Sequence, residues 1–300
     1  MDKKQLRGSL LLTLTALIWG TAFVAQTVGM DHIGPFTFNA VRTLLAGVAM
    51  IPVILLFDKL QKKPPMSPQL RRDTLVGGVV CGTVLFVASS LQQAGIEAIT
   101  ENASGKAGFI TAMYMVLVPI FGLFLKKRVS PIVWFSVVLA SVGLYFLSIQ
   151  GGFTLTSGDF YIMLCAIVFA LHILFIDHYT QYVDGIALSC AQFAVTSVVS
   201  LLVAAFTEVG CWGNIMDSIW PILYVGIFSS GVAYTLQIVA QKGSNPTVVS
   251  LLLSLESVFA VISGALILHE RLSARELLGC GLIMIAVVLT QLPQKNPKQA

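Results

Sequence analysis

Charged side chains are scarce in this 300-residue sequence: only 11% of the residues are Asp, Glu, Lys or Arg, whereas 56% are apolar. Soluble domains typically carry about one quarter charged residues, so this composition excludes an ordinary soluble fold. The mean hydropathy of +0.87 agrees with that exclusion. The chain is therefore predicted to be an integral membrane protein whose main partner is the lipid bilayer.

The sequence also lacks the short motifs of several common chemistries. It has no HExxH zinc motif, no GxSxG nucleophile turn, no paired acidic metal motif and no Walker loop. These absences argue against a membrane-embedded enzyme and exclude a self-contained ATP-driven pump. We therefore expect no enzymatic activity and no cofactor. A scaffold or receptor would leave the polar residues described below unexplained.

Cysteine is rare, and its spacing indicates no metal or redox chemistry. The five cysteines lie far apart, mostly inside apolar runs, and none forms a CxxC pair. An odd number without metal-ligand spacing is typical of packing thiols. The net charge of +4 is small and the basic residues cluster between apolar runs, so nucleic acid is not an expected partner.

What the sequence does contain is a series of apolar runs of about the 20 residues that a helix needs to cross a bilayer. Charged or turn-rich breaks separate ten such runs, at about 8–28, 36–57, 74–95, 103–125, 131–149, 158–177, 186–207, 218–241, 246–268 and 275–292. The predicted fold is an all-α membrane protein with ten transmembrane helices. One long loop is expected around Pro64, Pro65 and Pro68.

The basic residues predict the orientation of these helices. With both termini in the cytoplasm, 14 Lys and Arg residues lie on the inner side, and only Arg271 and Arg275 lie on the outer side. Such an excess is typical of cytoplasmic loops. Arg42 and Lys106 remain inside predicted spans.

The two halves of the chain, residues 1–150 and 151–300, are similar to each other. Asn102–Ser130 aligns with Asn245–Ser273, and the start of each half aligns in a way that brings Arg42 opposite Gln192. Five helices per half is an odd number, so the second half must enter the membrane from the opposite side. The prediction is an inverted repeat, an arrangement that many secondary transporters use.

At this point the chain resembles the drug/metabolite transporter superfamily, specifically its bacterial ten-helix EamA-type members. The matching stretches are LIWGTAF at 17–23, FNAVRTLLAG at 38–47, LQQAGIEAITENASGKAGFITAMYMVLVPIFG at 91–122, ALHILFIDHYT at 170–180, AYTLQIVAQKGSNPTVVSLLLSLESVF at 233–259 and ALILHERLSARELLGCGLIMIAVVL at 265–289. Together they cover nearly the whole chain in the family's order.

The resemblance implies a multi-pass protein of the bacterial inner membrane with both termini in the cytoplasm. It implies a central cavity lined by the first four helices of each half, with the fifth and tenth helices at the periphery, where we expect a homodimer contact. It also implies alternating-access transport of small metabolites, often as export. This chain departs from the family in having Glu256–Ser257 where Glu-Pro is common, so it lacks that kinking proline.

Glu256 is the first candidate site residue, because it lies near the middle of the apolar stretch from Asn245 to Arg271. A central charge costs at least about 2.5–3.5 kcal/mol on insertion scales. A low dielectric favours the protonated carboxyl, so Glu256 could exchange a proton as a cavity alternates between the two sides, or it could accept a cationic substrate group. The alternative is a structural carboxylate that a neighbouring backbone or hydroxyl group satisfies.

Two cations lie inside predicted spans. Arg42 could bind a substrate carboxylate or phosphate in bidentate fashion. It could instead snorkel to the headgroups or pair with Glu97 or Glu101. Lys106, about one turn into its span, has the same alternatives and could also balance Glu256.

Three aromatic residues lie at mid-span. Trp19 lies near the predicted midplane, away from the interfacial belts where tryptophan is common, so it could form a cavity wall for apolar or cationic ligands or simply pack. Tyr114 and Tyr234 carry hydroxyl groups that need partners, in a substrate or within the protein. Pro119, late in the fourth predicted helix, should bend that helix.

Neutral polar residues complete the set of candidates. His172 could titrate near neutral pH, although a lone intramembrane histidine is more often a helix contact. The amides of Gln92, Gln192 and Gln237 could orient a substrate or merely bridge helices.

The leading hypothesis is a secondary carrier, an exporter of small organic metabolites such as amino acids or related amines, coupled to protons through Glu256. The alternative is a facilitator, exchanger or importer of an anionic metabolite, a sugar phosphate or a lipid-linked substrate, with Arg42 and Lys106 as the anion site.

Overall fold

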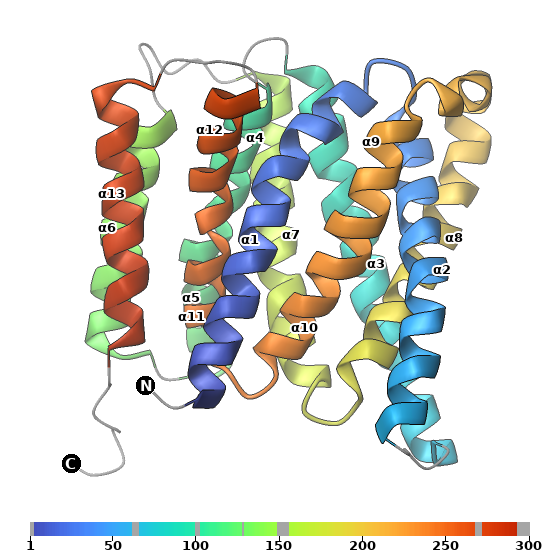
Figure 1. Cartoon of the computed structure of the whole chain (residues 1–300), viewed down its shortest axis with the longest axis horizontal. Coiled ribbons are helices and arrows are strands. Elements are labelled where there is room, and N and C mark those ends of the chain that lie inside the picture. Colours follow the sequence, from blue (N-terminus) through green and yellow to red (C-terminus); the bar gives the residue numbers. More distant parts are fainter. Residues whose placement is uncertain are drawn as a thin grey trace.

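The computed structural model describes residues 3–61, 66–99, 103–127, 129–148, 156–267 and 272–292. Within these ranges the chain is helical and has no strand, and its helices lie side by side as a single bundle (Figure 1). Nine described segments are long and apolar enough to span a membrane, and a shorter apolar helix, Pro131–Leu147, lies among them. The predicted all-α membrane fold is thus confirmed for the described ranges.

The first half contains α1 (Lys3–Gly29), α2 (Pro35–Gln61), α3 (Pro68–Ala98), α4 (Ala103–Ala112), α5 (Tyr114–Phe124) and α6 (Pro131–Ser148). The second half contains α7 (Ser157–Tyr179), α8 (Gly185–Thr207), the 3₁₀ helix η1 (Val209–Met216), α9 (Ile219–Leu223), the π-helix η2 (Tyr224–Tyr234), α10 (Thr235–Gln241), α11 (Pro246–Leu253), α12 (Leu255–Ile267) and α13 (Ala274–Gln291).

Short polar residues determine where several helices begin. Ser67 accepts a hydrogen bond from the Leu70 N–H, directly before the proline that opens α3. Capping boxes begin α7 and α13, in which Thr156 pairs with Asp159 and Ser273 with Glu276. Each cap satisfies backbone N–H groups that the first helical turn leaves without partners.

Helix α2 receives its cap from the other half of the chain. The carboxylate of Glu208, at the end of α8, accepts hydrogen bonds from the Phe36 N–H at 3.0 Å and from the Thr37 N–H at 2.7 Å. The Thr37 hydroxyl also donates to it, at 2.7 Å. A carboxylate near a helix N-terminus is favourable because it faces the positive end of the helix dipole. Glu208 thereby joins the end of α8 in the second half to the start of α2 in the first half.

The loop around the three prolines is shorter than predicted. Helix α2 continues to Gln61, and α3 already begins at Pro68, six residues before the predicted start at residue 74. Pro64 and Pro65 lie outside the described residues. Hydropathy marks the part of a helix that lipid surrounds, whereas backbone hydrogen bonds carry the helix on into the charged interface.

Three of the spans are interrupted. A turn at Met113 separates α4 from α5, a turn at Ser254 separates α11 from α12, and the π-helix η2 lies between α9 and α10. Pro119, at which a bend was predicted, lies inside α5, six residues after the break at Met113. The ninth span is interrupted even though no proline follows Glu256.

The halves enter the bundle from opposite ends and interleave. Helix α1 begins at the lower end of Figure 1, whereas α7 begins at the upper end. Helix α3 packs against α7 and α8, α2 packs against α8, and α1 packs against α12. Most of the extensive helix contacts therefore join one half to the other.

Helices α6 and α13 form a pair at the edge of the bundle (Figure 1). Their backbones meet at Gly143 and Gly279, where a Cβ on Gly143 would lie 2.8 Å from the Gly279 carbonyl oxygen. Small residues allow such close approach between membrane helices. The fifth and tenth spans are thus peripheral.

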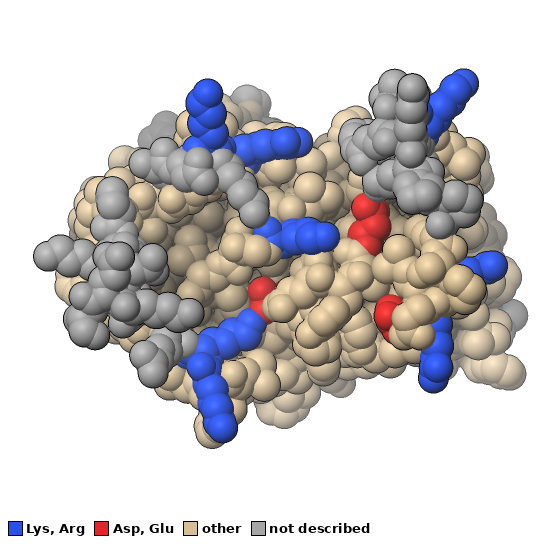
Figure 2. Space-filling view, turned by 90° about the horizontal axis from the view of Figure 1, so that it is seen from below, with Lys and Arg blue, Asp and Glu red and all other residues tan. Residues whose placement is uncertain are grey.

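Basic side chains gather at the lower end of the bundle. Figure 2 shows this face, where Lys and Arg residues surround a few carboxylates. Its exposed basic residues include Arg7, Lys59, Arg71, Arg72, Lys126 and Lys242. This is the end at which α1 begins and α13 ends.

Candidate functional site

The two interrupted spans that correspond in the two halves meet at their breaks. The Tyr114 hydroxyl, at the first residue of α5, donates to Glu256 Oε1 at 2.8 Å. Glu256 is the second residue of α12, and the alignment of Asn102–Ser130 with Asn245–Ser273 places it opposite Met113. Broken helices in corresponding positions of an inverted repeat are typical of transporter binding sites.

Serine side chains account for the break before Glu256. The Ser250, Ser254 and Ser257 hydroxyls each donate to the carbonyl three residues earlier, at 2.9, 2.8 and 2.7 Å. Such bonds compete with the backbone ladder and bend helices. The Ser257 N–H also bonds to the Ser254 carbonyl, in the tighter i→i−3 pattern. Hydroxyl groups thus interrupt this span without a proline at the break.

The π-helix η2 forms another wall of the site. A π-helix offsets backbone hydrogen bonds and is frequent at functional sites. The indole N–H of Trp19 donates to the Ser229 carbonyl at 3.1 Å, and the Thr15 hydroxyl donates to the Ala233 carbonyl at 3.3 Å. Helix α1 is thereby fixed along η2. The Trp19 and Tyr234 rings lie 4.7 Å apart in a tilted pair.

These elements line a narrow cavity, in which the centres of water-sized spheres have about 30 Å³ of room. Its walls come from both halves of the chain. The lining residues are Trp19, Phe23, Gln26, Arg42, Gln92, Thr111, Tyr114, Phe169, Ser229, Tyr234 and Glu256. Glu256 is only 3% exposed, so the carboxylate is separated from bulk water.

Arg42 reaches the same cavity with neutral partners. Its Nε donates to Asn39 Oδ1 at 2.8 Å, and its Nη1 donates to Gln26 Oε1 at 3.2 Å. The guanidinium carbon lies 5.8 Å from the centre of the Phe38 ring. Glu97 does not pair with it, and Glu101 lies outside the described residues. Within the described part of the chain, no carboxylate contacts Arg42.

Four of the ten candidates, Lys106, His172, Gln192 and Gln237, do not line this cavity. Lys106 forms an ion pair of 2.7 Å with Asp159, the residue that caps α7, and so does not balance Glu256. His172 Nε2 and Gln192 Oε1 lie 3.1 Å apart, and both residues are buried behind the cavity wall. Arg42 and Gln192, opposite each other in the alignment, therefore differ in position relative to the cavity. The imidazole ring contacts Tyr234 edge-on, with the ring centres 6.2 Å apart.

Several lining residues were not predicted. Gln26 and Thr111 carry polar groups into the cavity, and Asn39 holds Arg42. All three are polar residues within apolar runs, the same signal that identified Gln92. Phe23 and Phe169 have no distinguishing signal in sequence, because aromatic residues are frequent throughout membrane helices.

Replacing Tyr114 by Phe should destabilise the site. The substitution removes the hydroxyl that donates to the buried Glu256 carboxyl, which costs about 1–3 kcal/mol for an unsatisfied buried group. We expect a lower thermal unfolding temperature for the detergent-purified protein. The matched control is Tyr145→Phe on the exposed surface of α6, which should be neutral. Equal unfolding temperatures for both variants would contradict a stabilising Tyr114–Glu256 bond.

Comparisons with known proteins agree with this architecture. The model of the EamA-like transporter family matches residues 6–149 and 156–292. A protein from Archaeoglobus fulgidus, named an uncharacterized transporter, is 31% identical over 295 residues, covering 96% of this chain and 87% of the relative. The uncharacterized inner membrane transporter YedA of Escherichia coli K12 is 22% identical over 281 residues, covering 92% and 88%.

A solved crystal structure of a similar protein superposes on this chain with a TM-score of 0.77. The alignment covers 95% of this chain and 96% of the other chain at 17% sequence identity. At that identity the likeness shows the fold alone.

Proposed function

The chain belongs to the EamA-like transporter family and is a multi-pass membrane transporter. On that premise we propose that it is a secondary carrier of small zwitterionic metabolites, such as amino acids. Family membership also argues for a transporter and against an enzyme. The proposed carrier works by alternating access, exports its substrate and exchanges it for protons.

One observation carries this proposal: a buried guanidinium and a buried carboxyl group line the same cavity without pairing with each other. Isolated charges in a low dielectric are costly unless they are compensated. A bound molecule with one carboxylate and one ammonium group would compensate both. In the proposed complex, Arg42 binds the substrate carboxylate and Glu256 binds the ammonium group.

The aromatic wall supports a substrate with an apolar or cationic portion. Trp19 and Tyr234 present ring faces and edges beside the charged groups, and Phe169 and Phe23 extend this surface. Aromatic faces attract cations and apolar groups alike. Gln92, whose side-chain nitrogen donates to the Thr111 hydroxyl at 3.1 Å, adds an amide that orients the ligand without a further charge.

Proton coupling is assigned to Glu256. The carboxyl group lines the cavity and has one hydrogen-bond partner among the described residues, Tyr114. A carboxyl group that binds the substrate ammonium when ionised, and a proton otherwise, exchanges one cation for the other. Such competition yields proton-driven export without a further cofactor.

The proposed location is the bacterial inner membrane, with both termini and the basic lower face in the cytoplasm. The excess of Lys and Arg on that face supports this orientation, because basic residues are retained on the cytoplasmic side. The Escherichia coli relative is named an inner membrane transporter. A homodimer through the outward surfaces of α6 and α13 stays a prediction.

The test is ligand binding by the purified protein. Thermal shifts would be recorded with amino acids, with their methyl esters and with the amines that lack the carboxylate. We expect stabilisation by the zwitterions alone, and its loss in Arg42→Ala, because charge-assisted hydrogen bonds contribute about 1.5–3 kcal/mol. Arg275→Ala, an exposed arginine at the start of α13, is the matched control. Equal binding of zwitterions and amines would contradict the role of Arg42.

The second candidate function is a facilitator or exchanger of an anionic metabolite. Its support is the Arg42 guanidinium, which has only neutral hydrogen-bond partners among the described residues. Lys106, predicted to share this role, is paired with Asp159 instead. Stabilisation by sugar phosphates or other anions, and not by zwitterions, in the same thermal-shift panel would favour this second function.

A further inference from the structure

Buried polar side chains continue from the cavity toward the basic end of the molecule. Helices α7 and α10 run in the same direction there and pack against each other. Tyr234, at the cavity, contacts His172. One turn farther along, Gln237 Nε2 lies 3.5 Å from Gln241 Oε1, and Gln241 Nε2 donates to the Ile173 carbonyl at 2.6 Å. Contacts of polar side chains thus join α7 to η2 at the cavity and to α10 below it.

Several of these groups have no hydrogen-bond partner among the residues that the structure describes. They are Gln192 Nε2, Gln237 Oε1 and Ser189 Oγ, all from residues that are at most 1% exposed. An unsatisfied buried polar group costs about 1–3 kcal/mol, and ordered water usually removes that cost. These three groups lie on α8 and α10, which pack against each other. In a membrane protein that could use apolar residues at these positions, they indicate a site that holds water.

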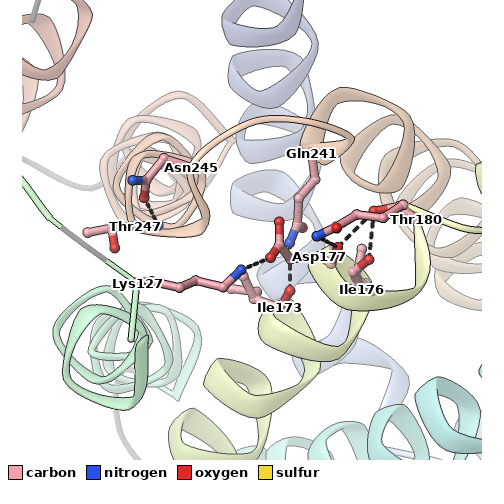
Figure 3. A network of polar contacts seen from close by, with 9 residues as sticks. Lys127, Ile173, Ile176, Asp177, Thr180, Gln241, Asn245 and Thr247 are labelled. Carbon is pink, nitrogen blue, oxygen red and sulfur yellow. Dashed lines mark hydrogen bonds and ion pairs between the residues drawn. The ribbon is translucent and has the colours of Figure 1, made fainter. Parts of the chain in front are cut away.

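The polar residues end at an ion pair on the basic face. Lys127, three residues beyond the end of α5, pairs with Asp177 near the end of α7. Figure 3 shows Gln241 pointing toward this pair. The Asp177 side chain is 6% exposed, whereas that of Lys127 is 32% exposed. The ion pair therefore lies at the boundary between the buried polar groups and solvent, and it joins a helix of the first half to a helix of the second.

We propose that the polar side chains of α7, α8 and α10 line an inner pathway from the cavity to the basic face, and that the Lys127–Asp177 ion pair closes it. The pathway comprises His172, Ser189, Gln192, Gln237 and Gln241. It fills with water when the ion pair separates, and the substrate and the coupling proton then reach the cytoplasmic side. This inference rests on the proposed carrier function for its cargo, but the opening itself is a property of the fold.

The experiment measures water access to Gln237 directly. Gln237→Cys is introduced, the protein is placed in lipid nanodiscs, and a membrane-impermeant methanethiosulfonate is added. Site-resolved mass spectrometry follows the modification of this cysteine alone. We expect slow modification in the parent and a roughly tenfold faster rate after Asp177→Asn, because the neutral amide no longer holds Lys127. Ser189→Cys, a nearly isosteric change on α8, provides a second reporter should Gln237→Cys fold poorly.

Matched controls distinguish opening of the proposed pathway from partial unfolding of the protein. Val239→Cys lies on the same helix with 39% of its surface exposed toward lipid, and its rate should not change. Lys127→Met should accelerate modification, whereas Lys126→Met, at the exposed neighbouring lysine, should not. Exchanging the charges, Lys127→Asp with Asp177→Lys, should restore the slow rate.

Two results would overturn the proposal. One is a modification rate at both reporters that Asp177→Asn leaves unchanged, whether slow or fast. The other is an equal acceleration at Val239→Cys, which would indicate unfolding and no defined pathway. The labelling needs no substrate, so these results are distinct from a failure of the proposed transport activity.

Discussion

Transport driven by a pH gradient is expected to fall to the level of protein-free liposomes in Glu256→Gln. Glutamine has nearly the same shape as glutamate and can still accept the hydrogen bond from Tyr114, so the cavity should persist. It cannot exchange a proton, and it no longer attracts an ammonium group. The measurement is efflux or uptake of a labelled amino acid in proteoliposomes with an imposed pH gradient.

The control for this prediction is the same substitution at an exposed glutamate. Glu97 lies at the end of α3, outside the cavity, and Glu97→Gln should transport like the wild-type protein. Gradient-dependent transport that survives unchanged in Glu256→Gln would remove the coupling role of this carboxyl group. The fold and the family assignment would be unaffected.

A single added methyl group at Gly20 should disrupt both stability and transport. A Cβ at this position would lie 2.6 Å from the Glu256 carbonyl oxygen, 2.6 Å from Phe259 Cβ and 2.8 Å from the Ala260 nitrogen. Two of these neighbours are backbone atoms, so α12 itself must move. Overpacking of this kind costs about 1–3 kcal/mol, and the displaced helix carries Glu256 away from Tyr114.

The unfolding temperature of Gly20→Ala and its transport rate test this prediction. Gly281→Ala is the matched control, since Gly281 lies within α13 and a Cβ there meets nothing within 4 Å. We expect clear losses in the first variant and none in the second. An unfolding temperature for Gly20→Ala equal to that of the wild-type protein would mean that α1 and α12 separate readily, contrary to the close packing described above.

The fold was largely predictable because a bilayer imposes strict rules on sequence. A segment that crosses it must be apolar and helical, so ten apolar runs define ten spans. The breaks at Met113 and Ser254 were not predictable in the same way. They depend on hydrogen bonds of individual hydroxyls and on the geometry of contacts between helices, which leave no change in hydropathy.

The sequence predicted those site residues whose charged side chains cost free energy inside a membrane span. Glu256 and Arg42 were identified because the cost of a charge inside a span must be offset by a partner or a ligand. Both residues line the cavity. Lys106 satisfied the same criterion, but its partner Asp159 lies at the start of the next half, a contact that only the folded chain reveals. Lys127 and Asp177 lie near helix ends, where charges cost little, so nothing in sequence distinguished their pairing.

The interleaving of the two halves has a consequence for biogenesis. Because α3 packs on α7 and α8, and α6 packs on α13, the amino-terminal half leaving the ribosome has few permanent neighbours of its own. Its small-residue surfaces must face lipid or an insertase until the later helices are threaded into the membrane. A truncated product of translation should therefore be a substrate for quality-control proteases, even though each of its helices is apolar enough to remain inserted.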